Sequence, residues 1–84
     1  MTTDEIKAKI ESGIETCQAT VTGDNGMFDA VVVADQFAGL TPVKKQQMVY
    51  KTVNDAIASG EIHALTIKTY TPDEWQTASK LKIG

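Results

Sequence analysis

The amino-acid sequence predicts one α+β domain with the element order α-β-β-α-β-α. Three features indicate it: apolar residues first recur at helical spacing, then alternate as in a half-buried strand, and two later Thr-Pro pairs restart helices. With 84 residues, 42% hydrophobic and 23% charged, the chain has room for one globular domain. The order is typical of a two-layer domain, a three-stranded sheet with helices on one face.

The first helix is expected over residues 3–15. Thr2 and Glu5 have the Ser/Thr-x-x-Glu spacing of a capping box, in which each side chain bonds the backbone of the other. The apolar stripe of this helix recurs every four residues, at Ile6, Ile10 and Ile14.

A β-hairpin follows this helix. Apolar and polar residues alternate from Cys17 to Val21, which predicts a strand with one buried face. The Gly23-Asp24-Asn25-Gly26 segment is a turn signal, because Asn and Gly tolerate positive φ. The valine-rich run from Met27 to Ala34 is then the partner strand.

The second half predicts a long helix, a third strand and a last helix. A short helical turn at 36–40 precedes Thr41-Pro42, a cap and first helical residue, and Ser59-Gly60 ends the long helix. A strand is expected over 62–70, and Thr71-Pro72 then opens the last helix. We expect one core from these elements, formed by Ile6, Ile10, Ile14, Val21, Val32, Val53, Ile57 and Ile67.

Five aromatic or sulfur-containing residues need separate interpretation. Tyr70 and Trp75 are expected to pack the last helix onto the sheet, because so small a domain needs its large apolar groups in the core. Met27, Phe28 and Met48 are alternatively partly exposed contacts for a partner.

The charge distribution argues against a strong nucleic-acid binder. Residues 1–43 hold seven acids and two lysines, whereas residues 44–84 hold four acids and six lysines. All eight basic residues are lysine, so the chain lacks the planar guanidinium that reads guanine edges and clamps phosphates. A weak lysine-rich face remains compatible with this composition.

The sequence favours a cytoplasmic protein. The N-terminus has no basic start followed by an apolar stretch, so no secretion signal is expected. No apolar run approaches the ~20 residues of a membrane span, so no membrane association is expected. The only cysteine, Cys17, has no partner for an internal disulfide, which fits a reducing compartment.

The chain contains the strings VKKQQ-x-VY at residues 43–50 and IHALTIK-x-YTP-x-EW at residues 62–75. With these strings it resembles the BolA-like family, and more closely its IbaG (YrbA-like) branch. The resemblance extends over residues 17–75 and implies a fold related to the type II KH domain. It also implies pairing with a monothiol glutaredoxin, through a shared [2Fe-2S] cluster, and regulation of transcription under stress.

The resemblance implies that His63 is a metal ligand. His63 lies in the string that carries the family's cluster-ligand histidine, and imidazole is an established iron ligand in such clusters. Taken alone, a single histidine is more often a strand residue hydrogen-bonded to backbone. The family's second ligand, Cys or His, comes from the loop between the first two strands, where this chain has Met27. A thioether is a poor ligand for an iron–sulfur cluster, and Cys17 is better interpreted as a small buried side chain.

The start of the long helix is a candidate face for a partner or nucleic acid. Its polar residues are Lys44, Lys45, Gln46, Gln47 and Lys51, which suit phosphates and polar edges. The alternative is an ordinary solvated helix face. The GXXG clamp of KH domains is absent, because the matching spelling at 23–26 lies in the hairpin turn.

The sequence therefore favours an adaptor over an enzyme. One His and one Cys, far apart in the chain, form no recognised catalytic arrangement, and no phosphate loop or cluster of metal-binding acids is evident. The leading interpretation is a non-enzymatic partner of a monothiol glutaredoxin. The second is a DNA-binding regulator that uses the lysine face weakly.

Overall fold

The order of helices and strands is the predicted one. The computed structural model describes the backbone of residues 1–83 and the side chains of residues 1–78. Its elements are α1 (Thr3–Gly13), β1 (Cys17–Asp24), β2 (Met27–Ala34), the 3₁₀ turn η1 (Asp35–Phe37), α2 (Pro42–Ala58), β3 (Ala64–Tyr70) and α3 (Pro72–Ile83). None of the helices in this part of the chain has the length and apolar character needed to cross a bilayer.

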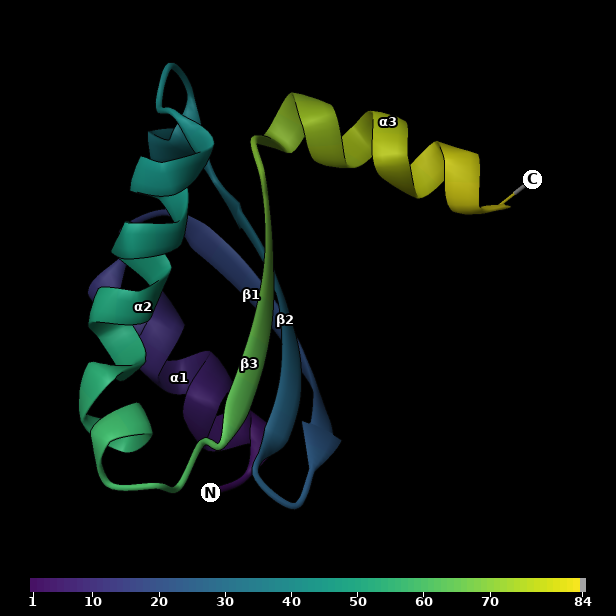
Figure 1. The fold of residues 1–84 in the computed structure, drawn as a ribbon. Helices are drawn as coiled ribbons and strands as arrows, with labels where there is room; N and C mark the ends of the chain where they lie inside the picture. Colours follow the sequence, from purple (N-terminus) through teal and green to yellow (C-terminus); the bar gives the residue numbers. More distant parts are fainter. Residues whose placement is uncertain (84) are drawn as a thin grey trace.

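The sheet is mixed, with β2 in the middle. β1 runs antiparallel to β2, from the Cys17–Ala34 pair to the Asp24–Met27 pair. β3 runs parallel to β2, and its first pair is Met27 with Ala64. Because a parallel pair needs a long crossover, α2 connects the two strands. This topology brings the β1–β2 turn and the start of β3 to the same end of the sheet (Figure 1).

Two of the three helices form the second layer. α1 and α2 cover one face of the sheet, whereas α3 begins at the far end of β3 and extends away from them (Figure 1). The Tyr70 and Trp75 rings lie 5.2 Å apart between centroids, inclined at 57°. These rings join the end of the sheet to the start of α3, as expected, but both residues are half-buried rather than part of the core.

The core lies between the sheet and the layer of α1 and α2. Six of the eight predicted core residues are buried, but Val21 and Ile57 are only half-buried against the core. Val21 lies on an edge strand and Ile57 in the last turn of α2, so both side chains reach the margin of the core. Sequence patterning missed the fully buried Phe37 and Val49. Phe28, considered as an exposed contact, is also buried.

The predicted boundaries of α1 and β3 were each wrong by two residues, and the helical turn predicted over 36–40 is the shorter η1 at Asp35–Phe37. α1 ends at Gly13, and Ile14 caps it by donating its N–H to the Ile10 carbonyl. β3 begins at Ala64, because the N–H of Ile62 bonds the Ala56 carbonyl at 3.2 Å and so belongs to the end of α2. The predicted capping box is confirmed at Thr2 with Glu5, and the same pair of hydrogen bonds forms at Thr71 with Glu74, where the last helix was expected to begin.

Helix side chains bond both outer edges of the sheet. On β1, the Glu11 carboxylate accepts the Ala19 N–H at 3.0 Å. On β3, the Gln46 amide donates to the Ile67 carbonyl at 3.0 Å, and the Tyr50 hydroxyl donates to the Leu65 carbonyl at 3.2 Å. These bonds occupy edge groups that a foreign strand would need, so they oppose strand addition there.

Candidate functional site

The backbone around His63 is fixed by the β1–β2 turn. The carbonyl of Gly26 accepts two hydrogen bonds, from the N–H of His63 at 2.7 Å and from that of Ala64 at 3.0 Å. The preceding residue, Ile62, is 2% exposed and anchors the segment in the core. His63 itself is exposed, so its side chain is presented to solvent from a firmly held backbone. The interpretation of a half-buried strand histidine is therefore wrong.

The imidazole of His63 lies directly against Gly26. A Cβ on Gly26 would collide with Cδ2 of His63 and lie 3.0 Å from Cγ and 3.2 Å from Nε2. Gly26 also has a φ of +81°, in the left-handed region that favours glycine. Sequence analysis identified Gly26 only as a turn residue. The structure shows a second role for Gly26: because it has no Cβ, the His63 ring can lie against its backbone.

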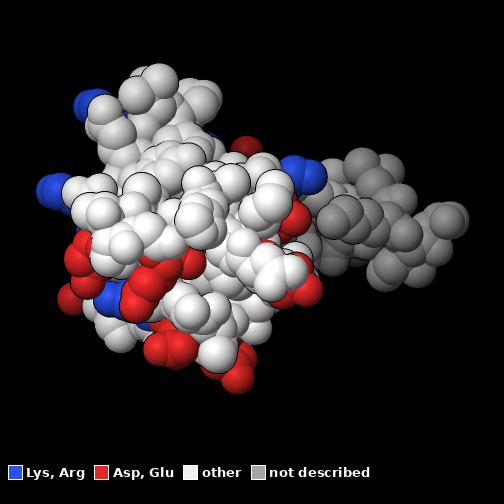
Figure 2. All heavy atoms as spheres, turned by 60° about the horizontal axis from the view of Figure 1, so that its bottom comes forward, with Lys and Arg blue, Asp and Glu red and all other residues white. Residues whose placement is uncertain are grey.

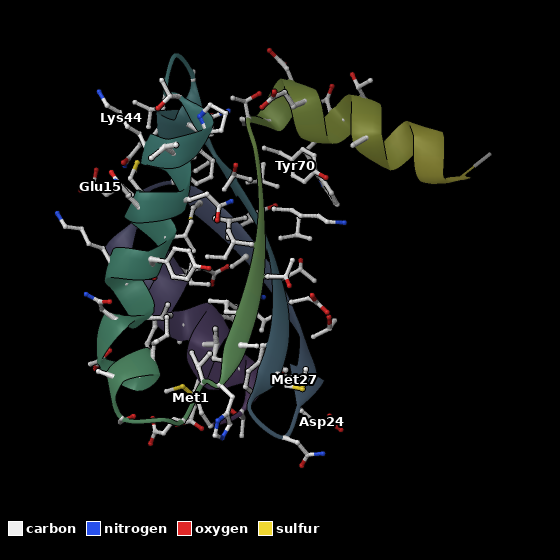
Figure 3. The ribbon with its side chains drawn as sticks, viewed as in Figure 1. Met1, Glu15, Asp24, Met27, Lys44 and Tyr70 are labelled. Carbon is white, nitrogen blue, oxygen red and sulfur yellow. The ribbon has the colours of Figure 1, made fainter. Side chains whose placement is uncertain are left out.

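Met27 lies beside this histidine. It pairs with Ala64, the residue after His63, and its side chain is 65% exposed. Figure 3 shows Met27 together with Asp24 at this end of the sheet. The structure thus brings together His63 and the position where the resemblance implies a second ligand.

Cys17 lies at the opposite end of the sheet. It pairs with Ala34, seven residues along β1 from the Asp24–Met27 pair. At ~3.3 Å per residue, the two ends are roughly 23 Å apart. Burial, and secondarily the carboxylate of Glu11, raises the pKa of the Cys17 thiol above its ordinary value. Cys17 is therefore half-buried and remote, and it does not join His63 in one ligand set.

The donors at this end of the sheet are one good iron ligand and one poor one. Within the described residues, no three His, Cys, Asp or Glu side chains are grouped so as to hold a metal ion. His63 offers one imidazole, which is a good iron ligand, and the Met27 thioether is a poor one. His63 thus fits one ligand position of such a cluster, and Met27 fits the second position poorly.

Acidic side chains predominate around this end of the molecule. Asp24 and Glu61 are exposed and lie within two residues of Gly26 and His63, respectively. Figure 2, with the lower end of Figure 1 turned forward, shows acidic residues in groups over the lower part of the view and lysines at the left and upper right, with uncharged residues between them. This charge disfavours a phosphate backbone as the ligand of the His63 end.

The predicted lysine face is divided between two sides of α2. Lys44, Gln47 and Lys51 are exposed and line one side together. Lys45 is half-buried, and its Nζ lies 3.9 Å from Glu74 Oε1. Gln46 is half-buried and bonded to β3, as described above. The continuous five-residue face that the sequence favoured is thus reduced to three residues at helical spacing.

The fold and the site together define a one-domain α+β protein that presents its single histidine at the end of a mixed sheet. Comparison with known proteins identifies its family. The chain belongs to the BolA-like family, whose family model, "BolA-like protein", matches residues 3–74.

Three similar proteins support this family assignment. The chain is 38% identical over 81 residues to the acid stress protein IbaG of Escherichia coli K12, covering 96% of each chain. It is 46% identical over 54 residues to the DNA-binding transcriptional regulator BolA of Vibrio cholerae, covering 64% of this chain and 50% of the regulator. A bolA protein homologue from Coxiella burnetii has the same fold, with a TM-score of 0.82, 39% identity, and coverage of 90% of this chain and 97% of that one.

Proposed function

We propose that the chain is a non-enzymatic cytoplasmic adaptor that pairs with a monothiol glutaredoxin in iron–sulfur cluster handling during stress. In this proposal His63 ligates one iron of a [2Fe-2S] cluster whose other ligands come mainly from the partner. The cluster, when bound, supplies an iron–sulfur unit that two proteins hold jointly and can pass on. The name of the Escherichia coli relative, an acid stress protein, supports the stress context.

The observation that carries the proposal is the placement of His63. Its backbone is held by two hydrogen bonds to Gly26, yet its imidazole is exposed. A histidine that served only the fold would be expected to bury its ring or bond it to backbone. A held backbone with an exposed ring suits a ligand offered to a group on another molecule, because little conformational entropy is lost on binding.

Met27 makes a specific contribution to this proposal. Since a thioether is a poor iron ligand, the shared cluster should be less stable than one with histidine or cysteine at that position. Met27 is exposed and pairs with the residue after His63, so a histidine there starts close to His63. Met27→His should therefore strengthen the visible spectrum of the shared cluster and slow its loss to chelators.

Anaerobic co-purification with a monothiol glutaredoxin, followed by a visible absorption spectrum, tests the proposal. The expected result is a cluster spectrum that requires both proteins. His63→Ala should abolish this spectrum while leaving the binding of the cluster-free partner intact. An unchanged spectrum in His63→Ala would exclude the ligand role, and failure of the two wild-type proteins to associate would exclude the partner.

DNA binding is the second candidate function. The similarity to the Vibrio cholerae regulator favours it, and so does the placement of Lys44 and Lys51 on one side of α2. A salt titration checks it, because affinity from phosphate contacts falls steeply with salt concentration. Two results would count against this candidate: binding of duplex DNA that does not weaken with salt, and binding that is unchanged in the Lys44→Glu with Lys51→Glu variant.

A further inference from the structure

Two adjoining hollows run along the outer side of α2. One, of about 310 Å³, is lined by Leu40, Lys44, Gln47, Met48 and Lys51. The other, of about 460 Å³, is lined by Gly13, Ile14, Met48, Lys51 and Thr52. Because they share Met48 and Lys51, they form a single depression, which we call the α2 groove.

The floor of the α2 groove is apolar. Leu40 and Met48 are half-buried against the core and leave some apolar surface for a ligand, whereas Ile14 is buried. α1 and α2 approach each other closely beside the groove, since a Cβ on Gly13 would lie 2.5 Å from Cγ2 of Thr52. Methionine is an adaptable contact residue, which suits a surface that receives side chains from outside.

The rim of the α2 groove is basic in a chain that is acidic overall. The net charge is −3, yet the lining contains Lys44 and Lys51 and no acid. The next acid along α2, Asp55, accepts a hydrogen bond from Lys9 Nζ at 3.1 Å and so is already paired. Glu15, on the same side of the molecule as Lys44 in Figure 3, is not part of the lining.

We propose that the α2 groove binds an acidic amphipathic helix of a partner protein. Lys44 and Lys51 are seven residues apart, or about 10.5 Å along the axis, which matches carboxylates two turns apart on a second helix. The apolar floor between them receives the hydrophobic side chains of such a helix, in the helix-in-groove mode of recognition. This surface is separate from His63, so the proposal does not depend on the shared cluster.

The same lining disfavours nucleic acid as the occupant. Single-stranded nucleic acid is held by aromatic side chains on which bases stack, and the lining contains no aromatic residue. The chain also has no arginine, the residue best suited to bidentate phosphate contacts. An apolar floor gains nothing from a sugar–phosphate backbone, but it does gain from leucine or isoleucine side chains.

Fluorescence anisotropy with a designed peptide tests the proposal. The probe is a labelled amphipathic helix of about fifteen residues, with a leucine stripe flanked by glutamates. Lys44→Glu with Lys51→Glu should weaken its binding about tenfold or more, because two attractive pairs become repulsive. The same variant should gain affinity for a peptide in which lysines replace the glutamates. Lys68→Glu, an exposed lysine on the opposite face of the sheet, is the matched control and should bind the acidic peptide as the wild type does.

Three results would overturn the proposal. Absence of peptide binding, with salt-sensitive binding of labelled DNA that the double variant abolishes, would assign the groove to nucleic acid. Absence of peptide binding, with self-association that the double variant abolishes, would assign it to a second copy of the chain. Absence of all binding would leave a solvated helix face. His63→Ala should bind the peptide normally, so failure of the cluster proposal and failure of this one are distinguishable.

Discussion

Replacing Gly26 with alanine should displace the His63 ring at a modest cost in stability. The change introduces a Cβ that collides with the imidazole, at a residue whose φ is +81°. A non-glycine residue in the left-handed region costs about 1–2 kcal/mol. The lower entropy of the unfolded alanine chain returns about 0.4–1 kcal/mol, so the free energy of unfolding should fall by roughly 1 kcal/mol. The ring is exposed and can rotate away, so the collision itself should add little to this loss.

Gly60 is a control of the same backbone conformation. Its φ is +84°, and a Cβ there would meet nothing within 4 Å. Gly60→Ala should therefore lose about the same stability in a urea titration as Gly26→Ala. Only Gly26→Ala should shift the imidazole signals in a long-range ¹H–¹⁵N spectrum, which contains one histidine side chain. Unchanged imidazole signals in Gly26→Ala would refute the inference that the ring rests on Gly26.

Three further predictions concern stability and charge. Val53→Ala should lower the free energy of unfolding by about 1–4 kcal/mol, because Val53 is fully buried. Ile57→Ala should cost less than the roughly 2–5 kcal/mol usual for a buried Ile→Ala, because Ile57 is half-buried; a loss at the upper end of that range in a urea titration would contradict its half-burial. Hydrogen bonds from the N–H groups of Thr2 and Thr71 lower the pKa values of the Glu5 and Glu74 carboxyl groups below 4.5. The two carboxylates therefore stabilise the fold above about pH 4.5, and this stabilisation is lost as the pH falls below it. Glu5→Gln with Glu74→Gln should thus flatten the acid limb of a plot of stability against pH; an unchanged limb would mean that the capping boxes do not persist in solution. Lys45→Gln should alter the free energy of unfolding by less than about 0.5 kcal/mol, since its ion pair with Glu74 is long, at 3.9 Å, and the Glu74 side chain is 53% exposed; a larger loss on thermal melting would show a stronger contact than the structure indicates.

The elements of this fold are predictable because their signals are local. The caps at Thr2, Thr41 and Thr71 and the turn at 23–26 each require particular residues at short spacing, and the structure shows them where expected. The boundary of β3 was missed for a tertiary reason, namely that the buried Ile62 bonds back to α2. Sequence alternation alone cannot distinguish such an anchor from the first residue of a strand.

The candidate site was less predictable, because its arrangement depends on long-range pairing. The resemblance singled out His63, but only the parallel register of β2 and β3 places it beside Gly26 and Met27, more than thirty-five residues earlier in the chain. Sequence analysis missed the role of Gly26 beside His63, because a glycine in a turn needs no further explanation. Helical periodicity likewise could not assign Lys45 and Gln46 to the side of α2 that faces Glu74 and β3, away from Lys44.

The central claim, that His63 ligates an iron of a shared cluster, is most directly tested by pulsed electron paramagnetic resonance. The chain is labelled with ¹⁵N on histidine alone, combined with unlabelled monothiol glutaredoxin and iron–sulfur cluster, and reduced. Because the chain has one histidine, a strong ¹⁵N coupling to the cluster can come only from His63. We predict that coupling in the wild-type complex and its absence in His63→Ala. A reduced mixed cluster without any ¹⁵N coupling, in a complex that contains both proteins, would contradict the claim.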